Sequence, residues 1–141
     1  MKYILRTSIE KVLKEKNRVY LAGNLKNSNE LANFEFGDYE IGISSYKEFT
    51  SDSPHRHIFN HEYNYLLSGQ MKVYIISEKK EYLFKKGDIF AIEPNMPYVT
   101  KAKEGTQVLF TKVPGGNDKE LIEVDDNLKH WQGGWENNVM D

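Results

Sequence analysis

Residues 54–69 read PHRHIFNHEYNYLLSG and hold three of the four histidines of this 141-residue chain. In an extended strand, side chains two residues apart point to the same face, so His55 and His57 can present two imidazoles side by side. Glu62 could bring a carboxylate from the next strand. Two histidines and one carboxylate, with other coordination positions left open, suit one divalent metal ion such as iron, manganese or zinc. The stretch therefore predicts a metal site made of His55, His57 and Glu62.

The spacing in this stretch forms part of a longer pattern. Four residues separate His57 from Glu62, six more separate Glu62 from Gly69, and a hairpin-sized gap of residues 70–86 follows. The next stretch opens with Gly87-Asp88, continues as IFAIEP and ends in a turn at residues 94–97. Together the two stretches resemble the two motifs of the cupin superfamily, and the match spans roughly residues 45–112.

This resemblance implies an all-β fold, the antiparallel cupin β-barrel that is also called a double-stranded β-helix or jelly roll. It implies metal binding by His55, His57 and Glu62, and a small polar molecule bound inside the barrel. Two positions depart from the family pattern. Phe49 stands where a glycine often precedes the histidine pair, and Tyr98 stands where a fourth histidine ligand is usual.

Tyr98 leaves three interpretations open. It could be a structural residue that packs its ring in the barrel and hydrogen-bonds its hydroxyl. It could be a fourth ligand, which requires an ionised phenol that only a close cation makes accessible. It could also carry a proton to or from a bound substrate. Tyr98 and Glu62 are therefore the candidate catalytic residues.

The two remaining histidines are expected outside the site. His61 directly precedes Glu62, so on a strand its side chain faces the opposite way. An irregular loop after His57 would instead let His61 replace the missing ligand. His130 lies far along the chain, beside Trp131, and is interpreted as a packed or exposed residue.

Short runs rich in aromatic and β-branched residues follow one another from Phe34 onward, separated by turn-forming residues. They leave little room for crossover helices, which favours an antiparallel barrel or sandwich. Because the faces of a strand alternate, only half of the aromatic candidates for the interior can point inward. These candidates are Tyr63, Tyr65, Tyr74, Phe90 and Tyr98.

The chain divides into a barrel over residues 34–113 and two flanking segments. Residues 1–33 are expected to hold a short helix, Ser8–Lys16, followed by loop and one short strand. Thr7 and Glu10 have the spacing of a capping box at the start of that helix.

Residues 114–141 are expected to form an irregular tail, because Gly133-Gly134 argues against a helix. In this tail Trp131 and Trp135 either pin the segment to the barrel or to a partner subunit, or stack on a sugar ring.

Composition excludes several classes of protein and site. The net charge of -2 gives no strong field for nucleic acid or an anionic membrane, and the chain has no cysteine for a disulfide, a thiolate nucleophile or a Cys-based zinc site. No apolar run resembles a secretory signal or a membrane span, so a cytoplasmic location is expected. Residues 1–20 are basic and residues 117–141 acidic, which is compatible with head-to-tail pairing in a homodimer.

Fold alone does not fix function, because one fold hosts many chemistries. The preferred hypothesis is a metal-dependent enzyme that isomerises or epimerises a sugar or sugar derivative. Within the same hypothesis of a metal-dependent enzyme, lyase and dioxygenase chemistry are the next reaction types. The second hypothesis is a non-catalytic ligand-binding cupin that serves as a sensor or accessory module.

Overall fold

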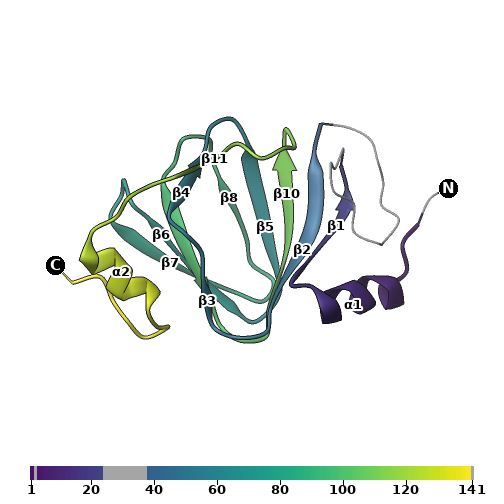
Figure 1. The fold of residues 1–141 in the computed structure, drawn as a ribbon, viewed down its shortest axis with the longest axis horizontal. Helices are drawn as coiled ribbons and strands as arrows, with labels where there is room; N and C mark the ends of the chain where they lie inside the picture. The colour runs from purple at the N-terminus through teal and green to yellow at the C-terminus, as the bar shows by residue number, and fades with distance from the viewer. Residues whose placement is uncertain (2, 24–37, 141) are drawn as a thin grey trace.

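The computed structural model describes residues 1, 3–23 and 38–140, which form two antiparallel sheets that face each other, with a helix at each side (Figure 1). The elements are α1 (Arg6–Glu15), β1 (Arg18–Ala22), β2 (Glu40–Tyr46), β3 (Thr50–Ser51), β4 (His55–His57), β5 (His61–Ser68), β6 (Gln70–Ile75), β7 (Lys80–Lys85), β8 (Ile89–Ile92), β9 (Tyr98–Ala102), β10 (Thr106–Val113), β11 (Lys119–Leu121) and α2 (Asp126–Gln132). The architecture confirms the predicted all-β antiparallel fold with a short N-terminal helix.

The strand order explains how distant segments meet. One sheet runs β1-β2-β10-β5-β8, and the other runs β11-β4-β9-β6-β7 with β3 added beside β9. Leu66 and Val108 of the first sheet share a buried cluster with Met71, Val73 and Tyr98 of the second. Apolar side chains therefore fill one end of the space between the sheets. The predicted barrel limit at residue 113 coincides with the end of β10, whereas the limit at residues 33 and 34 lies outside the described residues.

Gly69 ends the first motif because the turn between β5 and β6 has no space for a side chain. Its φ is +77°, and a Cβ at this position would lie 2.3 Å from Thr106 Oγ1. Thr106 uses that hydroxyl to accept a hydrogen bond from the Gln70 amide at 3.1 Å and to donate one to the Gln70 carbonyl at 3.0 Å. The glycine thus lets β6 turn directly against β10.

The N-terminal helix begins earlier than expected, and its predicted capping box is wrong. The N-cap is Leu5, which makes no side-chain cap, and Thr7 lies inside the first turn. Glu10 instead accepts a hydrogen bond from Arg6 Nε at 2.6 Å, one turn before it. No helix within the described residues is long and apolar enough to cross a membrane.

The prediction of an irregular C-terminal tail is wrong, because β11 joins β4 and α2 follows it. The glycine argument failed because α2 ends at Gln132, so that Gly133 is the C-cap and not an interior residue. Asp125 accepts a hydrogen bond from the Leu128 amide and caps the other end.

Trp131 is fully buried, its ring centroid lies 5.9 Å from that of Tyr74, and it donates a hydrogen bond to Glu81. It pins the tail to the barrel, and its burial leaves no face for a sugar.

A buried lysine connects this tail to the sheet. Lys101 in β9 has no exposed surface, and its ammonium donates to the carbonyl oxygens of Trp131, Gly134 and Asn137, each at 2.9 Å. The Lys101 Nζ also lies 4.1 Å from the Trp131 ring centroid. The ammonium therefore binds one carbonyl in the last turn of α2, which has no partner within the helix, and two carbonyls of the segment that follows it.

We expect Lys101→Met to lower the free energy of unfolding by about 2–4 kcal/mol, because it leaves three carbonyl oxygens without their donor. Urea unfolding measures this change. Lys103→Met is the matched control, since Lys103 Nζ lies 4.9 Å from the Trp135 ring centroid and its loss should cost about 1 kcal/mol or less. Equal losses in the two variants would contradict the anchoring role of Lys101.

Candidate functional site

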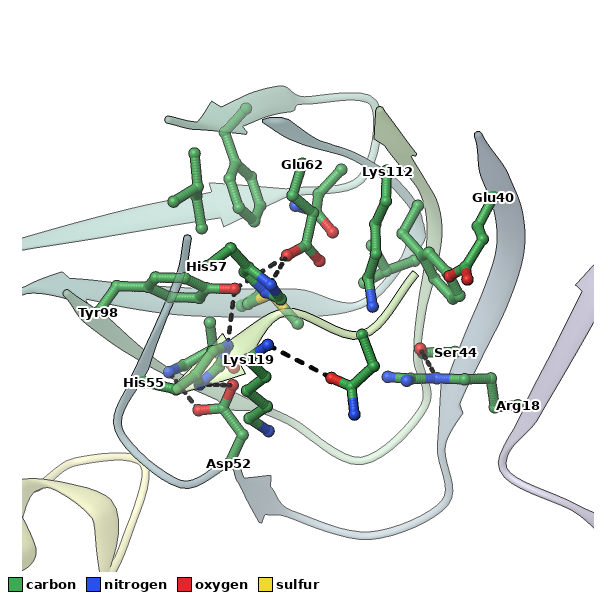
Figure 2. A pocket seen from close by; sticks show the side chains of 18 of the residues that line it. Arg18, Glu40, Ser44, Asp52, His55, His57, Glu62, Tyr98, Lys112 and Lys119 are labelled. Atoms are coloured by element: carbon green, nitrogen blue, oxygen red, sulfur yellow. Dashed lines mark hydrogen bonds and ion pairs between the residues drawn. The ribbon is translucent and has the colours of Figure 1, made fainter. Parts of the chain in front are cut away.

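A cavity of about 340 Å³ lies between the two sheets and is lined by side chains of both. His55, His57, Glu62 and Tyr98 gather at one side of it (Figure 2). His55 and His57 come from β4, Tyr98 from β9 and Glu62 from β5. The structure therefore brings together the four residues that the sequence nominated.

His55 and Tyr98 stand directly opposite each other on paired strands. The His55 Nδ1 lies 2.6 Å from the Ser53 carbonyl, and its Nε2 lies 2.9 Å from the Tyr98 hydroxyl. A carbonyl oxygen only accepts, so Nδ1 carries the proton and Nε2 presents a lone pair. Burial lowers the His55 pKa to about 4, which keeps the ring neutral.

His57 is held between two carboxylates. Its Nδ1 lies 2.7 Å from Asp118 Oδ1, and its Nε2 lies 3.1 Å from Glu62 Oε2. The hydrogen bond to Glu62, and after it the one to Asp118, outweigh burial and raise the His57 pKa. Both ring nitrogens face acceptors, so this arrangement favours the imidazolium form.

Glu62 connects the two sheets through contacts of its side chain. Its Oε2 accepts a hydrogen bond from the Tyr98 hydroxyl at 2.9 Å as well as the contact from His57. Burial opposes ionisation of Glu62, but the hydrogen bond from His57, the charge of Lys112 and the hydrogen bond from Tyr98 together lower its pKa. Burial, and after it the negative charge of Glu62, raise the Tyr98 pKa well above its usual value. Glu62 is thus the base and Tyr98 the protonated partner of this pair.

The hydroxyl of Tyr98 has one proton and two acceptors. When that proton goes to Glu62, the lone pairs of the Tyr98 oxygen and of His55 Nε2 face each other at 2.9 Å without a proton between them. A bound cation or an additional proton would relieve this contact. The cluster is therefore chemically suited to a positive charge at this point.

The kinds of atom in this cluster, imidazole nitrogens and carboxylate oxygens, are ones that bind a divalent metal ion. Each histidine has its Nδ1 engaged by an oxygen, which leaves Nε2 to face the cavity, as in metal-binding histidines. The 3.1 Å between His57 Nε2 and Glu62 Oε2 is close to the roughly 3.0 Å between ligands at right angles on an octahedral ion with bonds of about 2.1 Å. Across the described parts of the chain, no three His, Cys, Asp or Glu side chains are arranged so that they could hold a metal ion as they stand. Here the donor atoms contact one another directly.

The structure adds two acidic residues that sequence analysis missed. Asp118 accepts hydrogen bonds from the amides of Phe59 and Asn60 at 2.8 Å besides its contact with His57. Asp52 Oδ2 lies 3.8 Å from His55 Nδ1, and burial raises the Asp52 pKa to about 6. No sequence signal pointed to Asp118, because it reaches the site only when β11 pairs with β4.

The two other histidines lie outside the cavity, and the aromatic candidates are divided between the cavity wall and positions outside it. His61 is exposed on the opposite face of β5, and His130 is exposed on α2. Among the aromatic candidates, Phe90 and Tyr98 line the cavity. Tyr63 and Tyr65 face outward, and Tyr74 packs against Trp131.

We expect Asp118→Asn to lower the pKa of His57 in the metal-free protein, because it removes one of the two carboxylates that favour the imidazolium. Glu62→Gln should lower it further, since the hydrogen bond to Glu62 is the larger cause. An NMR titration of the His57 ring measures both changes. Glu120→Gln is the control, because Glu120 lies in β11, two residues after Asp118, and pairs with the partly exposed Arg56 and not with His57. An unchanged His57 pKa in Asp118→Asn would contradict the assignment.

Solved structures show the same fold. KdgF from Halomonas sp. is 20% identical, with a TM-score of 0.52 over 57% of this chain and 73% of that one. Pac13 from Streptomyces, described as a unique nucleoside dehydratase, is 15% identical, with a TM-score of 0.52 over 60% of this chain and 68% of that one. A structure from a study of the DMSP lyases RdDddP and RnDddQII is 14% identical, with a TM-score of 0.60 over 75% of this chain and 52% of that one.

Sequence comparison is more specific about the family. No curated protein matches the chain. Residues 43–113, which run from β2 to the end of β10, match the family described as Cupin domain. This match covers half of the chain and includes both of the sequence motifs that contribute residues to the cavity. The chain therefore belongs to the cupin domain family.

Proposed function

We propose that this cupin is a metal-dependent enzyme that isomerises or epimerises a sugar or sugar derivative. The observation that carries the proposal is the Tyr98–Glu62 hydrogen bond beside the two anchored histidines. It supports the proposal because a protonated phenol, a carboxylate and two imidazoles lie together at one wall of a cavity. A cavity of about 340 Å³ is at the small end of ligand sites, which suits a single sugar unit.

His55, His57 and Glu62 would hold the ion. A bound divalent ion would polarise a carbonyl or hydroxyl oxygen of the substrate as a Lewis acid. Ser53 and Asp118 keep the two imidazoles in the tautomer with Nε2 toward the cavity when both rings are neutral.

Tyr98 and Glu62 supply the proton transfer. The raised pKa of Tyr98 keeps its phenol protonated at neutral pH, which favours a proton carrier over an ionised ligand. The lowered pKa of Glu62 makes its carboxylate the acceptor of the same hydrogen bond. Isomerisation removes a proton from one carbon and returns it to the neighbouring carbon, which one donor and one acceptor at a single cavity wall can supply. Epimerisation returns the proton to the opposite face of the same carbon, so it also requires a second donor, such as water, on the other side of the substrate.

Elimination is the second candidate reaction. It begins with the same proton removal, and then a leaving group departs instead of a proton returning. Two structural neighbours are described as a nucleoside dehydratase and as DMSP lyases, which favours this class over an oxygen-dependent oxidation. A non-catalytic ligand-binding role is the remaining alternative.

We expect His57→Ala to abolish binding of zinc or manganese, because it removes one of three ligands. Calorimetric titration of the metal-free protein with each ion, together with elemental analysis of purified protein, measures the loss. His61→Ala is the matched control, because His61 is exposed on the neighbouring strand. This variant should bind the ion like the unchanged protein. Equal metal binding by His57→Ala and the unchanged protein would overturn the ligand assignment.

We expect Tyr98→Phe to keep its metal content and to lose turnover by about 100-fold or more, as for loss of a general acid or base. Turnover is followed by NMR in D2O with sugars and sugar derivatives. Deuterium at carbon with a saturated product indicates isomerisation or epimerisation, and a new double bond indicates elimination. Loss of metal in Tyr98→Phe would make Tyr98 a ligand, and the absence of both reactions in the metal-loaded protein would favour the non-catalytic role.

A further inference from the structure

Two cations gather around one aromatic ring on the side of the cavity away from Tyr98. The Arg18 Cζ lies 4.9 Å from the centroid of the Phe110 ring, and the Lys112 Nζ lies 5.8 Å from it. Both residues line the cavity, and in Figure 2 they lie to the right while His55 and Tyr98 lie to the left. The cavity therefore has a proton-transfer side and a second side where Arg18 and Lys112 meet. A third lining cation, Lys119, lies beside His55 and Asp52.

Strand register explains why these groups meet. Phe110 pairs with Gly42 across β2, and a Cβ at Gly42 would lie 2.4 Å from the Phe110 ring. Because Gly42 has no side chain, the ring can lie against β2. Lys112 is two residues further along β10, so it faces the same side of the sheet as Phe110. Arg18 enters from β1, where its Nε donates to Ser44 Oγ at 3.1 Å, which orients the guanidinium.

The two cations lack an anionic partner in the described part of the chain. Lys112 on β10 is paired with Glu40 of β2 on one side and with Glu62 of β5 on the other. Neither carboxylate, nor any other within residues 3–23 and 38–140, forms an ion pair with Arg18 or Lys112.

The nearby carboxylates are engaged elsewhere. Glu40 accepts from the Gly116 amide, Asp52 accepts from the Thr100 amide, and Glu62 contacts His57 and Tyr98.

On the basis of the proposed function, we infer that the substrate carries an anionic group, a carboxylate or a phosphate, that Arg18 and Lys112 bind. Two like charges around one ring repel each other, and an anion between them converts this repulsion into two attractions. A guanidinium and an ammonium are the usual partners of carboxylate and phosphate oxygens. Holding the anion at this side directs the rest of a small molecule toward Tyr98 and Glu62, which orients the reacting carbon.

Lys112 could instead act only on Glu62, whose pKa its charge lowers. The two roles of Lys112 predict different ligand affinities. An anion site makes affinity depend on the charge of the ligand, whereas an effect through Glu62 changes the affinities for neutral and anionic ligands alike.

Calorimetric titration with D-glucose, D-glucuronate, D-glucose 6-phosphate and inorganic phosphate tests the inference. We expect at least one anionic sugar to bind about tenfold or more tightly than glucose, as expected for hydrogen bonds to a charged group. Preference for glucuronate or for glucose 6-phosphate distinguishes a carboxylate from a phosphate substrate. Arg18→Met and Lys112→Met should each remove most of this preference and leave glucose binding unchanged.

Two further variants control for folding and for charge. Lys112→Arg keeps the cation and should keep the preference. Lys80→Met should also keep it, because Lys80 is an exposed lysine whose Nζ lies 4.6 Å from the Tyr82 ring centroid, outside the cavity lining. The inference is overturned if the sugar anions and phosphate bind no more tightly to the unchanged protein than to the Arg18→Met/Lys112→Met double variant.

Zinc binding by the Arg18→Met variant separates this inference from the proposed function. We expect Arg18→Met to bind zinc like the unchanged protein, because Arg18 hydrogen-bonds Ser44 and not a proposed metal ligand. Zinc binding without any preference for anions overturns the anion site alone. A preference for anions in a protein that binds no metal supports the anion site and overturns the metal-dependent function.

Discussion

The proton of the Tyr98 hydroxyl lies between two acceptors that belong to opposite sheets. His55 approaches it from the sheet that also carries Tyr98, and Glu62 approaches it from the other sheet. All three groups are buried or nearly so, where an unmatched lone pair is costly. The polar cluster thus connects the two sheets at the point where they enclose the cavity. Without an added positive charge, one of the two acceptors has no proton to accept. This unpaired acceptor makes the cluster a site for chemistry.

The C-terminal tail is part of this site and not an appendage. β11 pairs with β4 in register, which carries Asp118 to the back of the His57 ring. Further along, α2 packs on the outer face of the second sheet through Trp131 and is fastened by Lys101. A single stretch of chain therefore orients one imidazole and covers the sheet that bears it. Loss of the tail would affect the site through both contacts.

In the proposed function the cavity separates two tasks. One side holds a carboxylate, a protonated phenol and two imidazoles, and the other side holds two cations around Phe110. Binding energy from an anion at the cationic side would position atoms at the other side, which is how contacts remote from the chemistry raise a rate. Neighbours of similar fold share little sequence with this chain, so they show its fold and not its substrate. The homodimer and the cytoplasmic location stay predictions from sequence.

Sequence by itself determined the sheets, the hairpin between the two motifs and the group of His55, His57, Glu62 and Tyr98, because strand alternation and fixed spacings are local properties that survive into the fold. The sequence-based prediction is wrong for α2, because Gly133 ends this helix and does not interrupt it. Only the tertiary structure decided that Asp118 orients His57, that Lys101 holds the tail, and that Arg18 and Lys112 meet at Phe110. Except for the contact between Lys112 and Phe110 within β10, these contacts join residues 30 or more positions apart. The strand order that brings them together is a property of the whole barrel and not of any short pattern.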